Sequence, residues 1–263
     1  MSSLDRVVAS SDQKFGLEIP QAASAGTQLP VEATAQDAEL MASLKPFTMT
    51  SGERPGSLMN AVCHVSNNRV PGDFVECGLW CWGSVMAMTK ELSPLGVSDR
   101  QIWLYDTFAG MTAPIDEDAE AGSGVTAENM LDQTVVRDDD KVWCVAGLPG
   151  VQTNTYSTRC LKDKFTFVEG DAAQILSFLL PVSISLLRLD MDWCESTRME
   201  LKVLYPRLSV GGVCIFDDSG HWQGARKAVD EYFEKIGHRP YMHPIDYSGR
   251  VLIKTEPYPE SAG

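Results

Sequence analysis

Short apolar runs alternate with segments of helical spacing along most of this chain. Apolar runs of strand length occupy residues 73–77, 101–105, 165–169, 184–189 and 212–216. Helical spacing occurs around Met86, Met88 and Leu92 and in residues 57–67, 151–161, 172–180, 195–205 and 221–236. This alternation predicts a doubly wound α/β domain built on a mostly parallel sheet. Two further extended runs, residues 239–245 and 250–254, flank Ser248-Gly249 and predict a C-terminal antiparallel hairpin.

Residues 1–45 differ from the rest of the chain in composition. They are rich in Ala, Ser, Gln and Pro and have little periodicity, which predicts a flexible or partner-contacting N-terminal arm. The remaining residues, 46–263, are predicted to form one domain, because a chain of 263 residues with 44% hydrophobic content can support a single large core. Such an arm is compatible with a homo-oligomer in which it reaches a neighbouring subunit.

The charge of the chain narrows the partners that we expect. The formal net charge is -14 and the pI is about 4.7. Nucleic acids and anionic membranes favour clustered Lys and Arg, so we expect neither, and small molecules or proteins remain. No apolar segment has the length of a signal peptide or of a transmembrane helix, which predicts a cytoplasmic protein. The seven cysteines lack zinc-type spacing and are expected to be reduced thiols.

Two aspartate clusters give the strongest indication of chemistry. Asp190 and Asp192 follow one predicted strand, and Asp217 and Asp218 follow the next. Ligands of open α/β sheets collect at the carboxyl ends of strands, so the clusters would meet there as a repelling group or as a divalent-cation site. The hard oxygens of Asp190, Asp217 and Asp218 suit Mg²⁺. A substrate hydroxyl at such an ion would become more acidic, and Asp192 is the candidate general base that takes its proton.

A structural alternative stays open for the same four residues. Aspartate is favourable near the first turn of a helix, so Asp190 and Asp192 could cap the helix that follows them. The pair Asp217-Asp218 could cap the next helix in the same way. Because two pairs flank one strand-helix-strand unit, the cation site is the favoured interpretation.

The first strand-helix turn has features of a nucleotide site. Residues 76–84 read Glu-Cys-Gly-Leu-Trp-Cys-Trp-Gly-Ser, in which glycines allow close backbone approach and the next helix offers free N–H groups to an anionic ligand. The spacing is not the G-x-G-x-x-G of dinucleotide sites, and a glycine pair at such a junction often serves only tight packing. Asp106 ends the next strand, where an acidic residue can accept hydrogen bonds from ribose hydroxyls.

Several aromatic side chains near the predicted strand ends are candidates for contact with a substrate. His221 and Trp222 follow the second aspartate pair and could contact a hydroxyl acceptor, although a histidine at a helix start is more often a solvent-facing or capping residue. The other tryptophans that would line the same cleft, or pack in the core, are Trp80, Trp82 and Trp193.

The stretch from residue 110 to 124 is predicted to be a loop. It carries several glycines, Pro114 and the run Asp116-Glu117-Asp118. This composition is typical of a solvated loop, which either acts as a lid over a site or simply faces water.

Five ordered motifs resemble the macrocin O-methyltransferase family. They extend over about residues 46–254 and are Asp73-Phe-Val-Glu-Cys-Gly, Leu104-Tyr-Asp-Thr-Phe-Ala-Gly-Met111, Leu187-Arg-Leu-Asp-Met-Asp-Trp-Cys-Glu-Ser-Thr197, Leu204-Tyr-Pro-Arg-Leu-Ser-Val-Gly-Gly212, and Asp217-Asp218 followed by Gly224-Ala-Arg-Lys-Ala-Val-Asp230. The resemblance implies a seven-stranded Rossmann-like methyltransferase sheet. It also implies an S-adenosylmethionine- and Mg²⁺-dependent enzyme that methylates a small-molecule hydroxyl, often on a sugar of a glycosylated natural product such as a macrolide or an aminocoumarin.

Carried over to this chain, the resemblance implies a role for each site residue. The methionine end of the cofactor would be lined by Glu76, Gly78 and Ser84, and its ribose would be held by Asp106. The metal ligands would be Asp190, Asp217 and Asp218, and the general base would be Asp192. The family often has Arg-Gly at Cys81-Trp82 and a tyrosine near Cys194 and at Ser219, and the missing tyrosines predict an altered acceptor pocket.

Two other functions stay open at this point. A nicotinamide-dependent oxidoreductase would use the same glycine turn and Asp106, but it lacks the expected glycine spacing and does not explain Asp217-Asp218. A degenerate methyltransferase domain, in which Trp82 blocks the cofactor, would be a binding module without catalysis.

Overall fold

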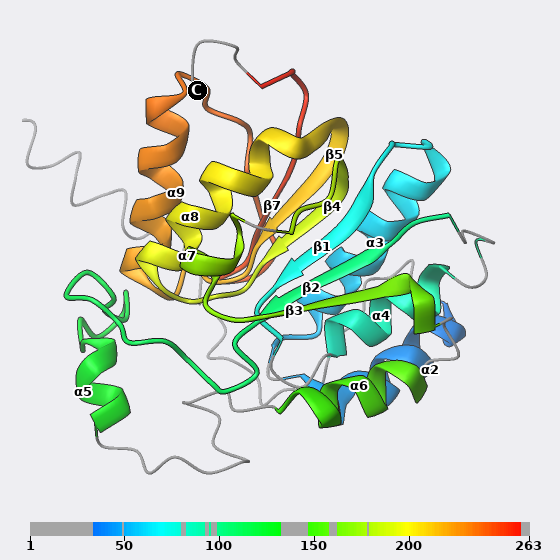
Figure 1. Cartoon of the computed structure of the whole chain (residues 1–263), viewed down its shortest axis with the longest axis horizontal. Coiled ribbons are helices and arrows are strands. Elements are labelled where there is room, and N and C mark those ends of the chain that lie inside the picture. Colours follow the sequence, from blue (N-terminus) through cyan, green and yellow to red (C-terminus); the bar gives the residue numbers. More distant parts are fainter. Residues whose placement is uncertain are drawn as a thin grey trace, which may run out of the picture.

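The centre of the molecule is a seven-stranded sheet with the order β3-β2-β1-β4-β5-β7-β6 (Figure 1). The computed structural model describes residues 34–48, 50–79, 83–92, 95, 99–132, 147–157, 162–177 and 179–258. Strands β1 to β5 are parallel, and β7 and β6 close one edge as antiparallel strands. The predicted doubly wound sheet and its C-terminal hairpin are therefore confirmed. Trp80, Cys81 and Trp82 lie outside the described residues.

The parallel strands are short and buried, as their apolar runs predict. They are β1 (Asp73–Cys77), β2 (Ile102–Asp106), β3 (Phe165–Glu169), β4 (Ile184–Leu189) and β5 (Leu208–Phe216). Every residue of β4 is buried, because helices cover both faces of the sheet at its centre. The hairpin strands are β6 (His243–Pro244) and β7 (Arg250–Ile253). Strand β5 extends through Gly211, whose φ of 84° is a conformation that glycine allows, and so begins earlier than residue 212.

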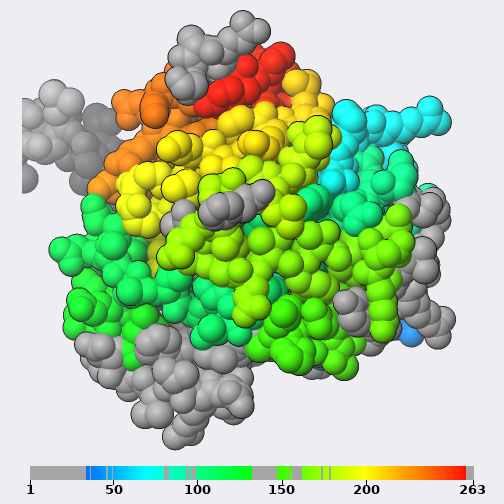
Figure 2. Space-filling model, viewed as in Figure 1, coloured from blue at the N-terminus to red at the C-terminus, as the bar shows by residue number. Residues whose placement is uncertain are grey.

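Helices cover the two faces of the sheet. One face carries α2 (Ala35–Leu44), α3 (Glu53–Asn67), α4 (Gly83–Leu92) and α6 (Leu148–Ser157), and the other carries α7 (Ala172–Ile175), α8 (Cys194–Leu204) and α9 (Gln223–Lys235) (Figure 1). The remaining short elements are α5 (Ala127–Asp132) and the 3-10 turns Lys45–Phe47, Lys162–Lys164 and Tyr205–Arg207. In the space-filling view, yellow and yellow-green side chains around α7 and α8 cover the sheet on the side facing the viewer (Figure 2). Within the described ranges, no helix combines the length and the apolar composition that crossing a membrane requires.

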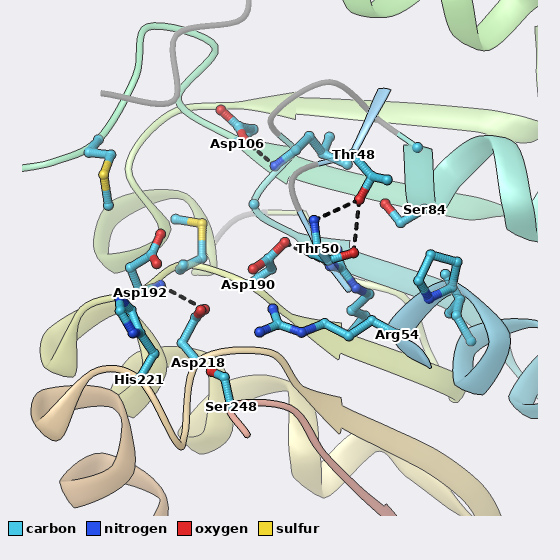
Figure 3. Close-up of a pocket in the computed structure, with 18 of the residues that line it drawn as sticks. Thr48, Thr50, Arg54, Ser84, Asp106, Asp190, Asp192, Asp218, His221 and Ser248 are labelled. Atoms are coloured by element: carbon cyan, nitrogen blue, oxygen red, sulfur yellow. Dashed lines mark hydrogen bonds and ion pairs between the residues drawn. The ribbon is translucent and has the colours of Figure 1, made fainter. Parts of the chain in front are cut away.

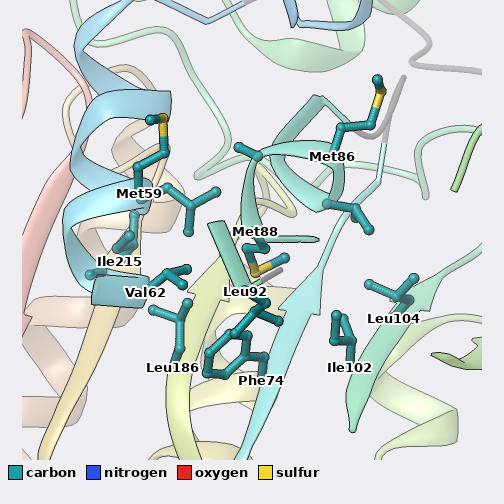
Figure 4. Close-up of a cluster of buried hydrophobic side chains, with 14 of the residues drawn as sticks. Met59, Val62, Phe74, Met86, Met88, Leu92, Ile102, Leu104, Leu186 and Ile215 are labelled. Carbon is teal, nitrogen blue, oxygen red and sulfur yellow. The ribbon is translucent and has the colours of Figure 1, made fainter. Parts of the chain in front are cut away.

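Successive strand residues enter two separate hydrophobic cores. In β1, Phe74 packs in the core beneath α3 and α4, and Val75 packs in the opposite core beneath α8 and α9. Figure 4 shows the first of these cores, where Phe74 lies close to Leu92 and Leu186. Because the sheet is packed from both sides, the residues that directly follow its strands are held in a defined arrangement.

The helix predicted for residues 172–180 is shorter in the structure. It ends at Ile175, and Leu179 and Val182 are 48% and 95% exposed. Pro181 restricts the residue before it to extended conformations, which opposes a helix through this apolar stretch. The stretch after α7 therefore leads to β4 partly as exposed chain.

Residues 35–44 of the predicted arm form helix α2 in the structure. Thr34 and Asp37 form a capping box at the start of α2, and Leu44 is buried in the core beneath α3 and α4. This part of the predicted arm therefore packs against the domain. The arm before Thr34 lies outside the described residues.

Candidate functional site

A pocket of about 330 Å³ opens where the parallel strands end (Figure 3). It lies at the carboxyl ends of β1, β2, β4 and β5, the usual ligand-binding edge of an open α/β sheet. Gly78 and Asp106 line one side of it, and Asp190, Asp192 and Asp218 line the other. Residues before and within α3, the loop after β2 and the turn of the C-terminal hairpin complete its wall. Aspartates from neighbouring strand ends therefore converge, as the sequence predicts.

Asp106 anchors the turn that follows β1. Its carboxylate accepts hydrogen bonds from the backbone N–H groups of Leu79 and Phe108, at 2.5 and 2.6 Å. Burial raises the pKa of Asp106 to about 6, and these two N–H groups oppose the rise. Gly78 has a φ of 85°, and a Cβ atom there would overlap the carbonyl oxygen of Asp190. Only glycine allows the ends of β1 and β4 to approach this closely.

Glu76 and Ser84 are in contact, but only Ser84 lines the pocket. Glu76 is completely buried in β1 and accepts hydrogen bonds from the Ser84 hydroxyl and from Arg188. Burial raises the pKa of Glu76 to about 7, and the positive charge of Arg188 partly opposes the rise. Glu76 thus lies behind Ser84 and orients it, and its direct contact with a cofactor stays a prediction.

Two arginines to which the sequence analysis assigned no role bind the acidic residues. Arg188, in β4, has a side chain that is only 7% exposed, and it forms ion pairs with Glu76, Asp190 and Asp217. Arg54, in the first turn of α3, pairs with Asp217 at 3.2 Å and with Asp246 of the C-terminal hairpin at 2.8 Å. A charge within an apolar strand requires a partner, so the position of Arg188 was a usable signal. Arg54 lies outside any apolar run and carried no such signal.

The acidic side of the pocket offers carboxylate oxygens, the donors that a divalent cation prefers. Among the described residues, no group of three or more His, Cys, Asp or Glu side chains surrounds a common metal position. Asp217 is fully buried, and its Oδ1 atom has no hydrogen-bond partner in the described part of the chain. Burial raises the pKa of Asp218 well above its usual range, and the negative charge of Asp192 adds to the rise. A divalent cation in the pocket would offset the charge excess of the carboxylates that line it, whereas Asp217 lies behind the lining, paired with Arg54 and Arg188.

The aspartates do not cap the helices that follow them. Helix α8 begins after Trp193 and α9 after Trp222, and neither N-cap residue makes a side-chain capping hydrogen bond. The N–H of Cys194 instead donates to Asp118, at 2.8 Å, from the loop after β2. Within the described residues, the capping interpretation of Asp190, Asp192, Asp217 and Asp218 is therefore wrong.

Asp192 is held in a left-handed backbone conformation beside the pocket. Its φ of 61° is uncommon for a residue other than glycine. Its N–H donates to Asp218 Oδ2 at 3.3 Å, and Trp222 Nε1 donates to its Oδ1 at 2.8 Å. Burial, followed by the negative charge of Asp190, raises the pKa of Asp192 to about 7. A carboxylate that gains protons near neutral pH is suited to general-base chemistry.

Of the two residues expected to contact an acceptor, only His221 lines the pocket. Its Nδ1 atom lies 3.4 Å from the hydroxyl of Tyr247, which is 70% exposed at the rim. Trp222 is buried behind the wall and packs against Trp193, with the ring centroids 4.9 Å apart. The expected acceptor contact of Trp222 is therefore replaced by its contact with Asp192. Tyr247 belongs to no motif and could not have been found from the sequence.

The loop after β2 is attached to the domain through Asp118. This residue is fully buried, and its carboxylate accepts hydrogen bonds from the N–H groups of Ile115 and Cys194 at 2.9 and 2.8 Å. A Cβ atom at Gly224 of α9 would overlap the same carboxylate. Two isolated antiparallel β-bridges extend the attachment. One joins Ala119 to Thr126, and the other joins Glu120 to Trp222. The prediction of a solvated loop is therefore wrong at Asp118, whose carboxylate satisfies two backbone N–H groups.

The strand order and the edge hairpin are those of the Rossmann-like methyltransferase fold, and the acidic pocket lies at the ligand-binding edge of its sheet. The solved structure of the O-methyltransferase NovP is similar, with a TM-score of 0.68 and 30% sequence identity over 80% of this chain and 83% of that one. The calicheamicin methyltransferase CalS11 shares the fold at a TM-score of 0.59 and 15% identity, with coverage of 88% and 99%.

Sequence comparisons identify the family. Residues 20–254 match the family model described as Macrocin-O-methyltransferase (TylF). Demethyldecarbamoylnovobiocin O-methyltransferase of Streptomyces niveus is 31% identical over 208 residues, which are 79% of this chain and 76% of the relative. Mycinamicin III 3''-O-methyltransferase of Micromonospora griseorubida is 30% identical over 202 residues, 77% of this chain and 76% of the relative. The chain therefore belongs to the macrocin O-methyltransferase family, and the resemblance predicted from its motifs is confirmed.

Proposed function

We propose that this chain is an S-adenosylmethionine-dependent, Mg²⁺-assisted O-methyltransferase that acts on a sugar hydroxyl of a glycosylated natural product. The observation that carries the proposal is a single pocket containing both Asp106, suited to a ribose, and Asp192, suited to removing a proton. Membership of the family supports methyl transfer to oxygen. A relative from Streptomyces olivaceus is named for a rhamnosyl-bearing tetracenomycin, which supports a sugar as the acceptor group.

The cofactor side of the pocket suits a sulfonium nucleoside. Bound S-adenosylmethionine would supply an electrophilic methyl group on its positively charged sulfur. The Asp106 carboxylate is placed to accept hydrogen bonds from the ribose hydroxyls. Gly78 allows the backbone to approach the ligand, and the Ser84 hydroxyl, oriented by Glu76, is available to the methionine end. The acidic lining favours a ligand whose reacting centre carries a positive charge.

Asp192 is the residue to which we assign the proton transfer. Asp192 would take the proton of the acceptor hydroxyl while that oxygen receives the methyl group that bound S-adenosylmethionine would supply, with S-adenosylhomocysteine as the leaving group. The pocket contributes mainly by holding oxygen and methyl carbon in line, an effect that can be worth roughly 7–11 kcal/mol. His221 and Tyr247, at the rim, are placed to contact the rest of the acceptor.

Mg²⁺ is the ion that we assign to the acidic side of the pocket. Its ligands would be Asp190, Asp217 and Asp218, because carboxylate oxygens are its preferred donors and Asp217 Oδ1 has no other partner among the described residues. When bound, the ion would stabilise negative charge on the acceptor oxygen. Arg188 counters the cost of burying the charge of Asp190 beside it.

Calorimetric titration tests the cofactor class. S-adenosylhomocysteine should bind, and NAD should show no heat of binding, because the turn after β1 lacks the dinucleotide glycine spacing. Tighter binding of NAD would refute a methyltransferase in favour of an oxidoreductase. If S-adenosylhomocysteine failed to bind at millimolar concentration, the non-catalytic binding module would be the better interpretation.

Methyl transfer from labelled S-adenosylmethionine to demethyldecarbamoylnovobiocin and to mycinamicin III tests the reaction, with Mg²⁺ and with EDTA. Asp192→Asn should lower kcat about 100-fold or more, since it removes the base. Asp190→Asn and Asp218→Asn should abolish both turnover and its response to Mg²⁺. Asp230→Asn, at an exposed position of α9, is the matched control. Full turnover in EDTA would contradict the metal assignment.

A further inference from the structure

Trp222 lies behind the pocket and donates a hydrogen bond to its acidic wall. We propose that it is a positioning residue, whose indole N–H holds the carboxylate of Asp192 in the orientation from which it removes the acceptor proton. The inference rests on the proposed function, in which Asp192 is the base. No sequence motif or family comparison assigns this role.

The contact between the two side chains is direct and buried. Trp222 Nε1 lies 2.8 Å from Asp192 Oδ1, and Trp222 is 7% exposed. The indole is not part of the pocket lining, so it can influence the reaction only through the residues that it touches. Its ring also packs edge-on against Trp193, the residue that follows Asp192 in the chain. One buried indole therefore contacts both the carboxylate of the base and its neighbour.

The backbone of Asp192 is left-handed, with a φ of 61° that is uncommon for a residue other than glycine. Its N–H is bound by Asp218, and its side chain is bound by Trp222. Both partners belong to the turn between β5 and α9. This turn thus fixes the base from two directions.

Trp222 is itself held on both sides. Its backbone N–H donates to the carbonyl of Asp218 at 3.0 Å. On its other side it forms an antiparallel bridge with Glu120, and the next residue, Gln223, donates to the carbonyl of Ala119 at 2.9 Å. The indole is therefore attached to the sheet turn and to the loop after β2 at once, which restricts its freedom to move.

The hydrogen bond determines which oxygen of the base is used. The indole engages Oδ1, which leaves Oδ2 to take the proton from the acceptor. Asp192 lies beside Asp190, whose negative charge repels its carboxylate. Without the indole N–H, this repulsion would turn the carboxylate away from its working position.

Two substitutions separate the hydrogen bond from the packing of the ring. Trp222→Phe keeps an aromatic ring but removes the donor. Trp222→His loses the six-membered ring, but its Nε2–H occupies the position of the indole Nε1–H within the five-membered ring. We expect kcat to fall about 10–100-fold in Trp222→Phe, with acceptor KM and S-adenosylhomocysteine affinity within about twofold of the wild type. Trp222→His should retain more kcat than Trp222→Phe, although it should melt at a lower temperature.

Trp103→Phe is the matched control. Its indole donates to Asp73 Oδ2 at 2.9 Å, at the start of β1, which is the opposite end of the sheet from the pocket. The same bond to an aspartate is lost there, and kcat should stay within about twofold of the wild type. The opposite result would be a kcat that follows the melting temperature, so that Trp222→Phe is more active than Trp222→His. That result would indicate a purely structural role for Trp222 and would overturn the proposal.

Crystal structures of the Trp222 variants with S-adenosylhomocysteine give a result that needs no acceptor. The Asp192 carboxylate should be displaced in Trp222→Phe and should keep its position in Trp222→His. An unmoved carboxylate in Trp222→Phe would overturn the inference even if the enzyme is active. Failure of the wild type to transfer a methyl group to either acceptor would count against the proposed function instead, so the two failures are distinguishable.

Discussion

Replacing Arg188 by methionine removes a cation that contacts three carboxylates of the site. The guanidinium of Arg188 pairs with Glu76, Asp190 and Asp217, and its side chain is 7% exposed. Methionine has similar length and no charge, so packing is largely kept while the ion pairs are lost. Buried charges that lose their partner are costly, because the interior cannot solvate them as water does.

The expected magnitude follows from how many charges remain unpaired. Removing one member of a buried ion pair commonly costs about 3–5 kcal/mol of unfolding free energy. Two features of the site favour the lower end of that range. Glu76 already has a pKa of about 7, caused first by burial, and can take up a proton, and Asp217 keeps its pair with Arg54. A loss near the lower limit corresponds to a fall in Tm of roughly 6–12 °C for a domain of this size.

The pH dependence has a definite sign. Loss of Arg188 raises the folded-state pKa of Glu76 and Asp190 further above their unfolded values. A carboxyl group whose pKa is higher in the folded than in the unfolded state contributes stability at low pH. That contribution is lost as the pH rises through the folded-state pKa. The gap in Tm between Arg188→Met and the wild type should therefore be largest near about pH 8 and should narrow toward about pH 5.

Differential scanning calorimetry of the metal-free protein across this pH range measures the effect. Arg198→Met is the control, because the ion pairs of Arg198 with Glu195 and Glu231 are exposed. It should change the unfolding free energy by no more than about 0.5 kcal/mol. Equal shifts in Tm for the two variants, or a gap that widens toward acid pH, would refute the reasoning. Millimolar Mg²⁺ should restore part of the loss in Arg188→Met if the carboxylates bind the ion.

Two further predictions concern the cofactor side of the pocket. Gly78→Ala should weaken S-adenosylhomocysteine binding about tenfold or more in calorimetric titration, because its Cβ atom would overlap Asp190 and its φ of 85° is strained for alanine. Gly122→Ala is the control, since a Cβ atom there meets nothing within 4 Å, and it should leave the affinity unchanged. The affinity of the wild type for S-adenosylhomocysteine should fall as the pH drops through about 6, because protonated Asp106 accepts hydrogen bonds poorly. Asp106→Asn should bind more weakly at neutral pH and lose this part of the pH dependence, and an unchanged pH profile would contradict the assignment.

The sheet and the acidic pocket were predictable because both follow from local sequence. Strands β1, β3 and β4 begin and end where their apolar runs do. Asp106, Asp190 and Asp218 reach one pocket because each ends or directly follows a parallel strand, and such ends meet at the same edge of a sheet. No contact between distant segments had to be known in advance.

The remaining parts of the site depend on contacts that leave no local pattern. Arg54 reaches Asp246 across 192 positions of the chain, and this pairing exists only because α3 crosses the hairpin turn. Trp222 was expected at the acceptor, but the way α9 begins directs its indole toward Asp192. In the sequence, Asp118 belongs to an acidic run that is expected to be exposed. In the structure, the approach of α8 and α9 buries it.

The pairing of Asp118 with Gly224 has a consequence for engineering the acceptor range. The loop after β2 forms part of the pocket wall, and its buried carboxylate fits only where α9 carries no side chain. A chimera that receives this loop from a relative must keep an aspartate at position 118 and a glycine at position 224 together. If only one of these two residues is replaced, the grafted loop cannot pack against α8 and α9, even when its pocket-lining residues fit the new acceptor.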